Sequence, residues 1–315
     1  MLHKNNLPRI IADLLMLKEK GECRFDYATD RSFSKFCTFR IGGRIAHLFI
    51  PQDIPSLCLL FRTLRLGGVP CLVLGGGSNV LPHDDGYAGA VVLTSHLRQI
   101  RVFENRLYAA CGATLNDCIL ASAGQGLSGM ECLYGIPATV GGAIYMNAGA
   151  NGMEISDRLE RVELYDPDAD VVFHLSPLQM CFSYRESILH IRRNLVVLGA
   201  TFVLTPKDSR CVMQTVRDVT QKRLRSQPLQ YPSAGSAFKR PRSDTEAWRL
   251  IDGCGLRGHC RGGAQISEKH AGFIINRGGA TAEDVRTLIT HVRREVLHTT
   301  GVLLIPEIEI LENGK

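Results

Sequence analysis

The chain has 315 residues, of which 45% are hydrophobic and 22% charged, and its net charge is +6. This length exceeds the usual size of one hydrophobic core, so we expect two or three domains, and the composition excludes a disordered or fibrous chain. The scattered basic residues and the aromatic content of 7% argue against nucleic-acid binding and weakly favour an anionic small-molecule substrate.

The N-terminal segment and the cysteines bear on the compartment. Apolar residues repeat at helical spacing at Leu7, Ile10, Ile11, Leu14 and Leu15. This spacing predicts an amphipathic helix and not a signal peptide, and no apolar run approaches the ~20 residues that span a bilayer. Eleven cysteines stand singly in apolar segments, which is typical of reduced cysteines in a cytoplasmic protein. Cys254, His259 and Cys260 lack the spacing of a zinc site, and we expect no metal.

The first glycine-rich loop follows a predicted helix over 53–66 and a strand over 70–74. The loop reads Gly75-Gly-Gly-Ser-Asn-Val-Leu81, and a strand followed by such a loop is typical of phosphate binding. The spacing is not that of the nicotinamide-binding Rossmann fingerprint, and Pro82 interrupts any following helix. A simple glycine-rich turn is the alternative.

A second glycine-rich segment, Gly135–Gly152, follows a predicted strand over 89–94, a hairpin at 104–106 and a helix from Thr114. It holds five glycines and almost no charge, so it is no solvated linker, and Pro137 makes it poor helix material. It is best explained as buried backbone against a large, flat ligand, although a tight helix–sheet crossing is also possible. Two such segments favour a dinucleotide.

Strands are predicted over 159–165, 171–175 and 195–204. Arg185 lies between the last two, flanked by Tyr184 and Ser187. It could pair with a substrate carboxylate or a developing enolate oxygen, or it could be a surface arginine bonded to Glu186.

A basic amphipathic helix, with Val212, Val216, Val219 and Leu224 on its apolar face, is predicted over 209–226. It leads into the segment Tyr231–Pro241. Prolines fix φ near both ends, and Gly235 permits left-handed backbone just before Ser236. The pattern predicts a rigid loop that presents Ser236 to an anionic substrate, and an ordinary polar turn is equally compatible with it.

The remaining chain predicts a small α+β domain. A helix is expected over 245–252, strands over 263–267 and 271–276, a helix from Thr281 to Gly301 and a terminal strand over 302–310. In that strand Glu307 and Glu309 should share one face, and Ile308 and Ile310 the other. Glu307 is either a catalytic acid or a solvent-facing residue.

Taken together, the motifs resemble the UDP-N-acetylenolpyruvoylglucosamine reductase family from about Phe33 to Ile310. The segments in the family's order are 75–81, 135–149, 184–187, 231–241, 263–276 and 306–307. The short spacing between Arg185 and Ser236 resembles the family form that lacks an insertion. The resemblance implies an α+β fold, with a two-subdomain FAD-binding region of the vanillyl-alcohol-oxidase type and a C-terminal substrate domain. The implied boundaries are 1–98, 99–206 and 207–315.

The resemblance also implies an activity. NADPH would reduce non-covalent FAD, and flavin N5 would give hydride to the enolpyruvyl ether of UDP-N-acetylglucosamine, forming UDP-N-acetylmuramate for peptidoglycan synthesis. The enzyme would be a cytoplasmic monomer without membrane or nucleic-acid partners.

Roles for individual residues follow from the same resemblance. Arg185 and Glu307 would stabilise the enolate, and Ser236 would donate the proton. The implied flavin-binding residues are Gly75, Gly76, Gly77, Ser78, Asn79, Val80, Gly135, Ile136, Pro137, Thr139, Gly141, Gly142 and Ile144. The implied substrate-binding residues are Tyr184, Lys239, Arg240 and Gln265.

Three positions depart from the family pattern, namely Cys37, Ala138 and Cys260-Arg261. Ala138, in place of a common glycine, matters most if that position needs a positive φ. Two other functions remain open: a related FAD-dependent hydroxy-acid or alcohol oxidase, and a non-catalytic nucleotide-sugar binding protein.

Overall fold

The computed structural model describes residues 6–242 and 244–313, which form two compact units. The first unit gathers the described residues up to Thr29, His47–Gly76 and Gly89–Gln221. The second gathers Asp30–Ala46, Gly77–Ala88 and the chain from Lys222 on. The three predicted domains stay a prediction. In the structure, residues 30–46 and 77–88 belong to the same unit as the C-terminal part of the chain.

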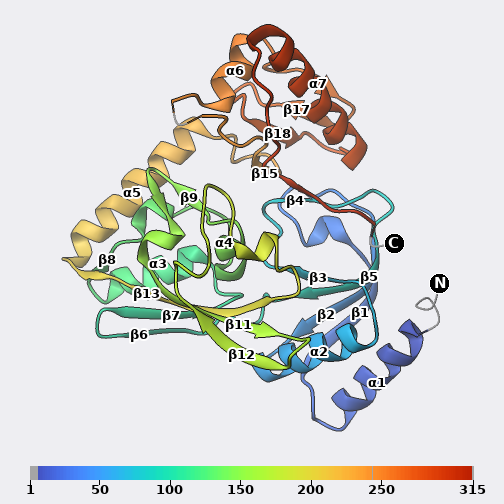
Figure 1. The fold of residues 1–315 in the computed structure, drawn as a ribbon. Coiled ribbons are helices and arrows are strands. Elements are labelled where there is room, and N and C mark those ends of the chain that lie inside the picture. The colour runs from blue at the N-terminus through green and yellow to red at the C-terminus, as the bar shows by residue number, and fades with distance from the viewer. Residues whose placement is uncertain (1–5, 243, 314–315) are drawn as a thin grey trace. The chain divides into compact units, whose positions relative to one another are not determined.

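Helices and strands are interspersed along the chain (Figure 1). The helices are α1 (Leu7–Glu19), α2 (Ile54–Leu66), α3 (Leu115–Gly124), α4 (Val140–Tyr145), α5 (Ser209–Ser226), α6 (Ala247–Gly253) and α7 (Ala282–Thr300). The strands up to the middle of the chain are β1 (Phe25–Ser32), β2 (Arg44–Pro51), β3 (Cys71–Leu74), β4 (Val80–Leu81), β5 (Tyr87–Leu93), β6 (Ile100–Phe103), β7 (Arg106–Ala110), β8 (Leu127–Ser128), β9 (Gly149–Ala150) and β10 (Met153–Glu154). The later strands are β11 (Leu159–Asp166), β12 (Val171–Leu175), β13 (Val196–Val203), β14 (Thr205–Pro206), β15 (Ser233–Ser236), β16 (Cys260–Arg261), β17 (Ala264–Ile266), β18 (Phe273–Asn276) and β19 (Glu309–Ile310).

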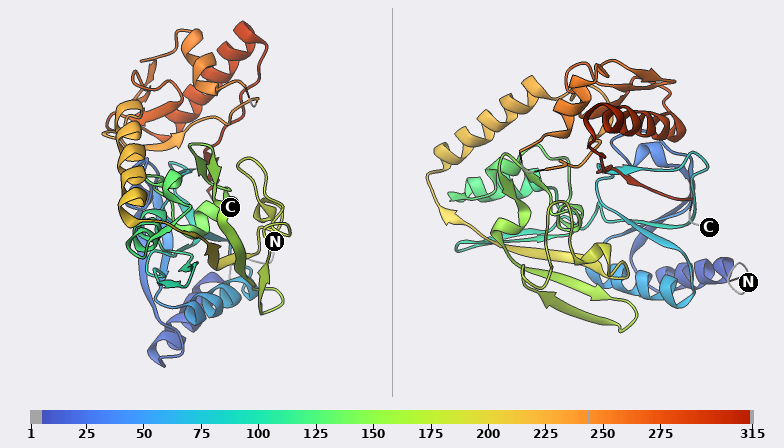
Figure 2. Two further views of the ribbon diagram at one scale, coloured as in Figure 1. Left: turned by 90° about the vertical axis from the view of Figure 1, so that its left-hand side faces the viewer. Right: turned by 45° about the horizontal axis from the view of Figure 1, so that its top comes forward.

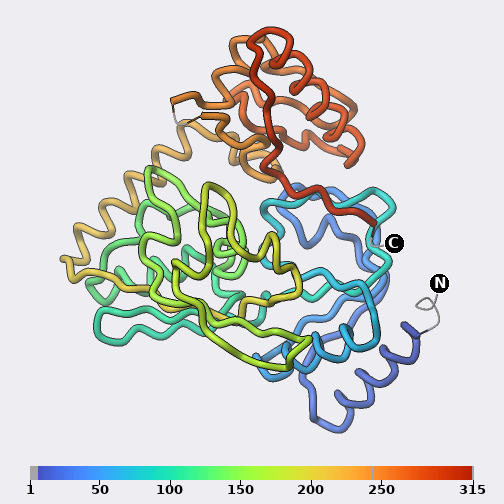
Figure 3. Tube along the Cα trace, in the orientation of Figure 1, coloured from blue at the N-terminus to red at the C-terminus, as the bar shows by residue number. Residues whose placement is uncertain are grey.

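The first unit contains two larger sheets, besides the two-stranded pairs β10-β9 and β14-β8. One has the strand order β1-β2-β5-β3, with the parallel pair β3 and β5, and its strands lie mainly in this unit. The other has the order β12-β11-β13-β7-β6, and its neighbouring strands are antiparallel. Helix α1 lies beside α2 (Figure 3), and α4 packs against β13. One hydrophobic core, reaching from Ile11 to Val216, serves this unit.

The second unit holds the antiparallel sheet β15-β18-β17-β16. Helix α7 lies against this sheet, as Figure 2 shows, and α6 packs on α7. Thr281 and Asp284 form a capping box at the predicted start of α7, and Gly301 ends the helix at φ +72°. The apolar face of α7 is buried in a second core, at Val285, Leu288, Ile289, Val292 and Val296.

Most predicted helix boundaries are confirmed, because they depend on local capping. Asp53 accepts a hydrogen bond from the Ser56 amide at the start of α2, and Gly67 caps its end. Thr114 likewise accepts from the Asp117 amide at the start of α3. On α5 one expectation is wrong, because Leu224 is 56% exposed and does not belong to the buried face.

Two other expectations are wrong. The segment Gly135–Gly152 contains the short helix α4, which its glycines argued against, because the Thr139 hydroxyl caps the Gly142 amide and Pro137 lies before the first turn. Of the terminal strand expected over 302–310, only β19 forms, and it pairs in parallel with β4. Residues 305–307 instead form an isolated β-bridge with residues 237–239, through backbone hydrogen bonds.

The eleven cysteines are all free thiols. Burial raises the pKa of Cys58 to about 11 and that of Cys118 to about 12, so both stay protonated near neutral pH. Within the described residues, no helix combines the length and apolar character that a membrane crossing requires.

Candidate active site

The two glycine-rich segments touch one another within the first unit. A Cβ on Gly75 would collide with the Thr139 hydroxyl, and one on Gly76 would lie 3.0 Å from the Pro137 carbonyl oxygen. Only glycine permits so close an approach. The structure therefore brings together two backbone segments that the sequence separates by some sixty residues, as a dinucleotide site would require.

The second segment also packs closely against Cys111. The Gly141 amide donates to the Cys111 carbonyl at 2.8 Å, and a Cβ on Gly141 would lie 3.2 Å from that oxygen. Ala138 is not among the described residues with positive φ, and its carbonyl accepts from the Leu115 amide at 3.0 Å. The alanine at this position therefore causes no backbone strain.

Arg185 sits at the tip of a tight turn in the first unit. Ser183 and Glu186 exchange two backbone hydrogen bonds of 3.1 Å, with Tyr184 and Arg185 between them. Arg185 has φ +60°, which is costly for a residue with a long side chain. Its guanidinium donates to the Gly149 carbonyl at 3.0 Å and lies 4.8 Å from the Tyr184 ring centroid. Such strain concentrates at functional sites, and no local sequence signal predicts it.

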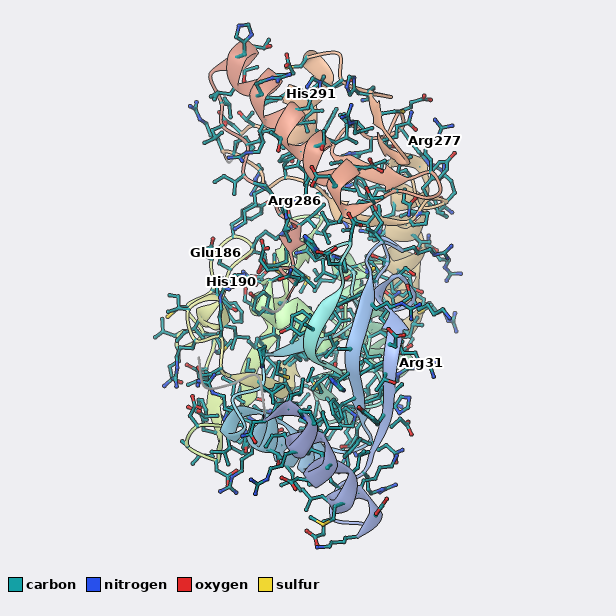
Figure 4. The ribbon with its side chains drawn as sticks, turned by 90° about the vertical axis from the view of Figure 1, so that its right-hand side faces the viewer. Arg31, Glu186, His190, Arg277, Arg286 and His291 are labelled. Atoms are coloured by element: carbon teal, nitrogen blue, oxygen red, sulfur yellow. The ribbon has the colours of Figure 1, made fainter. Side chains whose placement is uncertain are left out.

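The residues after the turn anchor it. Glu186 and His190 lie on the same loop (Figure 4), and His190 accepts from the Ser187 amide at 3.3 Å. The Ser187 hydroxyl donates to the Tyr145 carbonyl at 2.8 Å, and the Tyr145 and His190 rings stack with centroids 4.2 Å apart. Ser187 is 4% exposed, so this anchor is buried.

Ser236 lies in the second unit as the last residue of β15, so the expected loop is in part a strand. The reason is pairing with β18, whose register shifts between Ser233 and Ser236. Gly235 has φ +77°, which confirms the left-handed backbone expected before the serine. The Ser236 side chain is exposed. A bulged strand, rather than two prolines alone, therefore presents the hydroxyl.

Glu307 lies on the neighbouring segment. Its amide donates to the Ala237 carbonyl at 2.9 Å, and its carbonyl accepts from Asn79 Nδ2 at 3.0 Å. The Glu309 amide donates to the Asn79 carbonyl at 2.9 Å. Glu307 and Glu309 are half-buried and Ile308 is 4% exposed, as the predicted alternation requires, whereas Ile310 is half-buried like the glutamates. The structure thus brings Ser236, Glu307 and Asn79 together, and the link through Asn79 was not predicted.

Gly77 and Thr38 join the same region of the second unit. The Thr38 amide donates to the Gly77 carbonyl at 3.0 Å, and the Thr38 hydroxyl donates to the Ser233 carbonyl at 2.7 Å. Thr38 therefore ties the glycine loop to the serine strand, a role that sequence reasoning missed because its partners are remote. Cys37 is buried beside it, and burial raises the pKa of its thiol, which donates to the Ile41 carbonyl at 3.3 Å.

Gly77 gives a direct test of this backbone geometry. Gly77→Ala should unfold at lower urea and retain less flavin, because its Cβ would collide with the Phe36 carbonyl at φ +60°. Gly152→Ala is the matched control, since Gly152 has φ +79° with open space around it. This variant should lose only about 1 kcal/mol of its free energy of unfolding, from backbone strain alone. Equal urea midpoints for the two variants would contradict the steric argument.

The predicted substrate-binding residues of the second unit lie in different environments. The Lys239 amide donates to the Ile305 carbonyl at 2.8 Å, and Arg240 lies 3.9 Å from the Glu246 carboxylate. Gln265 is 7% exposed and donates to the Gly258 carbonyl at 3.0 Å. Sequence reasoning assigned no role to His270, which accepts from the Gly272 amide at 3.1 Å. Burial, together with Arg257, lowers the pKa of His270 and keeps the ring neutral near pH 7.

Comparison with known proteins defines the class. Residues 45–173 match the model of an FAD-binding domain, and residues 227–311 match that of the C-terminal domain of UDP-N-acetylenolpyruvoylglucosamine reductase. The glycines of both segments lie within the reach of these two matches or beside it, and at Gly75 and Gly76 a Cβ would meet Thr139 and Pro137, so the two backbone segments can meet only as glycine. The chain is thus an FAD-dependent oxidoreductase, and the expected cofactor and α+β class are confirmed.

Curated relatives identify the family. The UDP-N-acetylenolpyruvoylglucosamine reductase of Caldicellulosiruptor saccharolyticus is 41% identical over 93% of this chain and 95% of its own. That of Clostridium beijerinckii is 39% identical over 89% and 91%. A crystal structure of the reductase from Thermus caldophilus matches with a TM-score of 0.75 and 32% identity, over 92% of this chain and 99% of that one. This chain belongs to the UDP-N-acetylenolpyruvoylglucosamine reductase family, which confirms the resemblance and leaves the oxidase and binding-protein alternatives without support.

Proposed function

We propose that this chain reduces the enolpyruvyl ether of UDP-N-acetylglucosamine to UDP-N-acetylmuramate, with NADPH as reductant, in peptidoglycan precursor synthesis. The observation that carries the proposal is the hydrogen bond between the Glu307 amide and the Ala237 carbonyl. It holds the Ser236 hydroxyl and the Glu307 carboxyl on adjoining segments. When bound, FAD accepts hydride from NADPH and supplies it to the terminal methylene carbon of the substrate.

Arg185 and Glu307 stabilise the negative charge that develops on the substrate carboxylate. A guanidinium supplies a fixed cation and a protonated carboxyl group supplies a hydrogen-bond donor, and both are most effective when they are positioned in advance. The bond from Arg185 to Gly149 supports this role, because it restrains the side chain before substrate arrives.

Ser236 donates a proton to the carbon next to the one that receives hydride. A serine hydroxyl is a weak acid, so the transfer depends on placement against a strongly basic, carbanion-like carbon. The exposure of Ser236 at the end of β15 supports access of a substrate to it.

The remaining candidate residues bind the two ligands. The backbone of Gly75, Gly76, Gly77, Gly141 and Gly142 approaches the flavin nucleotide, with Ser78, Asn79, Val80, Gly135, Ile136, Pro137, Thr139 and Ile144 beside it. Lys239 and Arg240 bind anionic groups of the substrate, and Tyr184 and Gln265 contact it. The enzyme works as a cytoplasmic monomer, and its FAD is not covalently attached.

A coupled absorbance measurement tests the function. Purified protein is mixed with NADPH and the enolpyruvyl substrate, and the nicotinamide band is followed. We expect substrate to accelerate NADPH oxidation, and equal rates with and without it would refute the proposal. Acid should also release a yellow flavin, since a covalent oxidase would retain it and a flavin-free binder would have none.

A further inference from the structure

Asn147 has a buried side-chain amide whose polar atoms contact three residues on two separate segments. It is 1% exposed, lies two residues after α4 and has φ +42°. Its Nδ2 donates to Glu154 Oε2 at 2.7 Å and to the Ser183 carbonyl at 3.0 Å, and its Oδ1 accepts from the Ser156 amide at 3.4 Å. Both donors and the acceptor are therefore used inside the protein, where an unmatched group costs about 1–3 kcal/mol.

The contact with Ser183 matters because Ser183 closes the turn that carries Arg185. The two backbone bonds between Ser183 and Glu186 fix that turn, and the Ser187 hydroxyl and the Arg185 guanidinium bond to the Tyr145 and Gly149 carbonyls. All three attachments reach residues 145–149, which continue directly from α4. The glycine-rich segment assigned to the flavin and the turn of Arg185 are thus one hydrogen-bonded assembly.

Glu154 completes the assembly from the other side. Its strand β10 pairs with β9, placing Glu154 opposite Gly149, and a Cβ on Gly149 would lie 3.0 Å from Glu154 Cγ and 3.3 Å from Arg185 Nη1. The Glu154 carboxylate orients the Asn147 amide so that Nδ2 faces Ser183. Without that acceptor one amide hydrogen of Asn147 is left unmatched in a buried position, which weakens the hold of the amide on Ser183.

We infer that Asn147, oriented by Glu154, is a positioning residue that places the Arg185 guanidinium for the step in which charge develops on the substrate. The inference rests on the proposed function for the role of Arg185. Neither Asn147 nor Glu154 is assigned a contact with substrate. Their effect is transmitted through the turn 183–186, where a displacement near 1 Å can cost about 100-fold in rate.

Asn147→Asp is the most direct test, because it keeps the shape and the acceptor for Ser156. It replaces the donor with a carboxylate oxygen that faces two acceptors, Glu154 and the Ser183 carbonyl. We expect substrate-dependent reoxidation of the flavin to slow about 100-fold, while NADPH reduces it within about three-fold of the wild-type rate. Hydrogen exchange at the Glu186 amide, followed by mass spectrometry of the segment 181–190 in the holoenzyme, should accelerate at least about ten-fold, since 1.4 kcal/mol is a factor of ten.

A second pair of variants covers the case in which Asn147→Asp does not fold. Glu154→Gln keeps an acceptor oxygen for Asn147 and should remain near wild type, whereas Glu154→Ala should slow reoxidation and accelerate exchange at Glu186. Asn151→Gly is the matched control, because Asn151 also has positive φ, at +53°, and donates to a carbonyl, that of Cys132, outside the turn. It should change neither measurement.

Two results would overturn the inference. One is unchanged exchange at the Glu186 amide in a folded Asn147→Asp or Glu154→Ala protein, and the other is an equal slowing of both half-reactions. A wild-type protein that does not respond to the enolpyruvyl substrate would instead refute the proposed function, and the exchange comparison would still decide whether Asn147 holds the turn.

Discussion

Replacing Ser236 with alanine is expected to leave NADPH reduction of the flavin intact and to slow its reoxidation by the enolpyruvyl substrate about 100- to 10,000-fold. This range is what a positioned proton donor contributes. The hydroxyl is needed only in the reaction with the enolpyruvyl substrate, where proton donation accompanies hydride transfer, so reduction of the flavin by NADPH does not depend on it. Stopped-flow absorbance of the flavin, with NADPH and substrate added in sequence, measures the two steps separately.

Ser233→Ala is the matched control for this experiment. Ser233 lies in the same strand, and the contact that joins it to Thr38 uses its carbonyl, which alanine keeps. Ser236 is exposed, so its truncation should change the free energy of unfolding by no more than about 0.5 kcal/mol. Loss of the NADPH step in Ser236→Ala would show that the residue is structural, and an unchanged substrate step would exclude it as proton donor.

The local fold could be predicted wherever short-range chemistry determines it. The capping box at Thr281 and Asp284, the end of α7 at Gly301 and the hairpin before Arg106 each depend on residues close together in the chain. Burial along α7 followed the helical period, because the backbone geometry of a helix is itself local. These features need no knowledge of distant segments.

Features that depend on distant partners could not be predicted from composition or periodicity. Residues 305–307 read as a strand, but their hydrogen bonds go singly to 237–239. A flavin contact of Asn79 stays a prediction, and the bond from its side-chain amide to the Glu307 carbonyl was not foreseen. The family resemblance selected Arg185, Ser236 and Glu307, whereas their supporting residues Thr38, Asn147 and Glu154 are recognisable only from the contacts they make.

The second large effect is expected at Arg185, whose backbone is strained. We expect Arg185→Asn to fold as stably as wild type, within about 1 kcal/mol, while the substrate step slows about 100- to 1,000-fold. Asparagine adopts left-handed backbone more readily than arginine, which relieves about 1 kcal/mol at φ +60°. That gain offsets the lost hydrogen bond to Gly149. Urea unfolding and the rate of flavin reoxidation measure the two quantities.

Glu104→Asn separates the relief of strain from the chemistry. Glu104 has φ +51° at the exposed turn between β6 and β7, so the same substitution should raise stability there and leave both half-reactions unchanged. If Arg185 instead serves stability, Arg185→Asn should be less stable than wild type. Each folded, flavin-loaded molecule of that variant should then react with substrate at the wild-type rate. Arg185 retains a strained backbone although a less strained residue fits, and this is expected only if the guanidinium is needed at the tip of the turn.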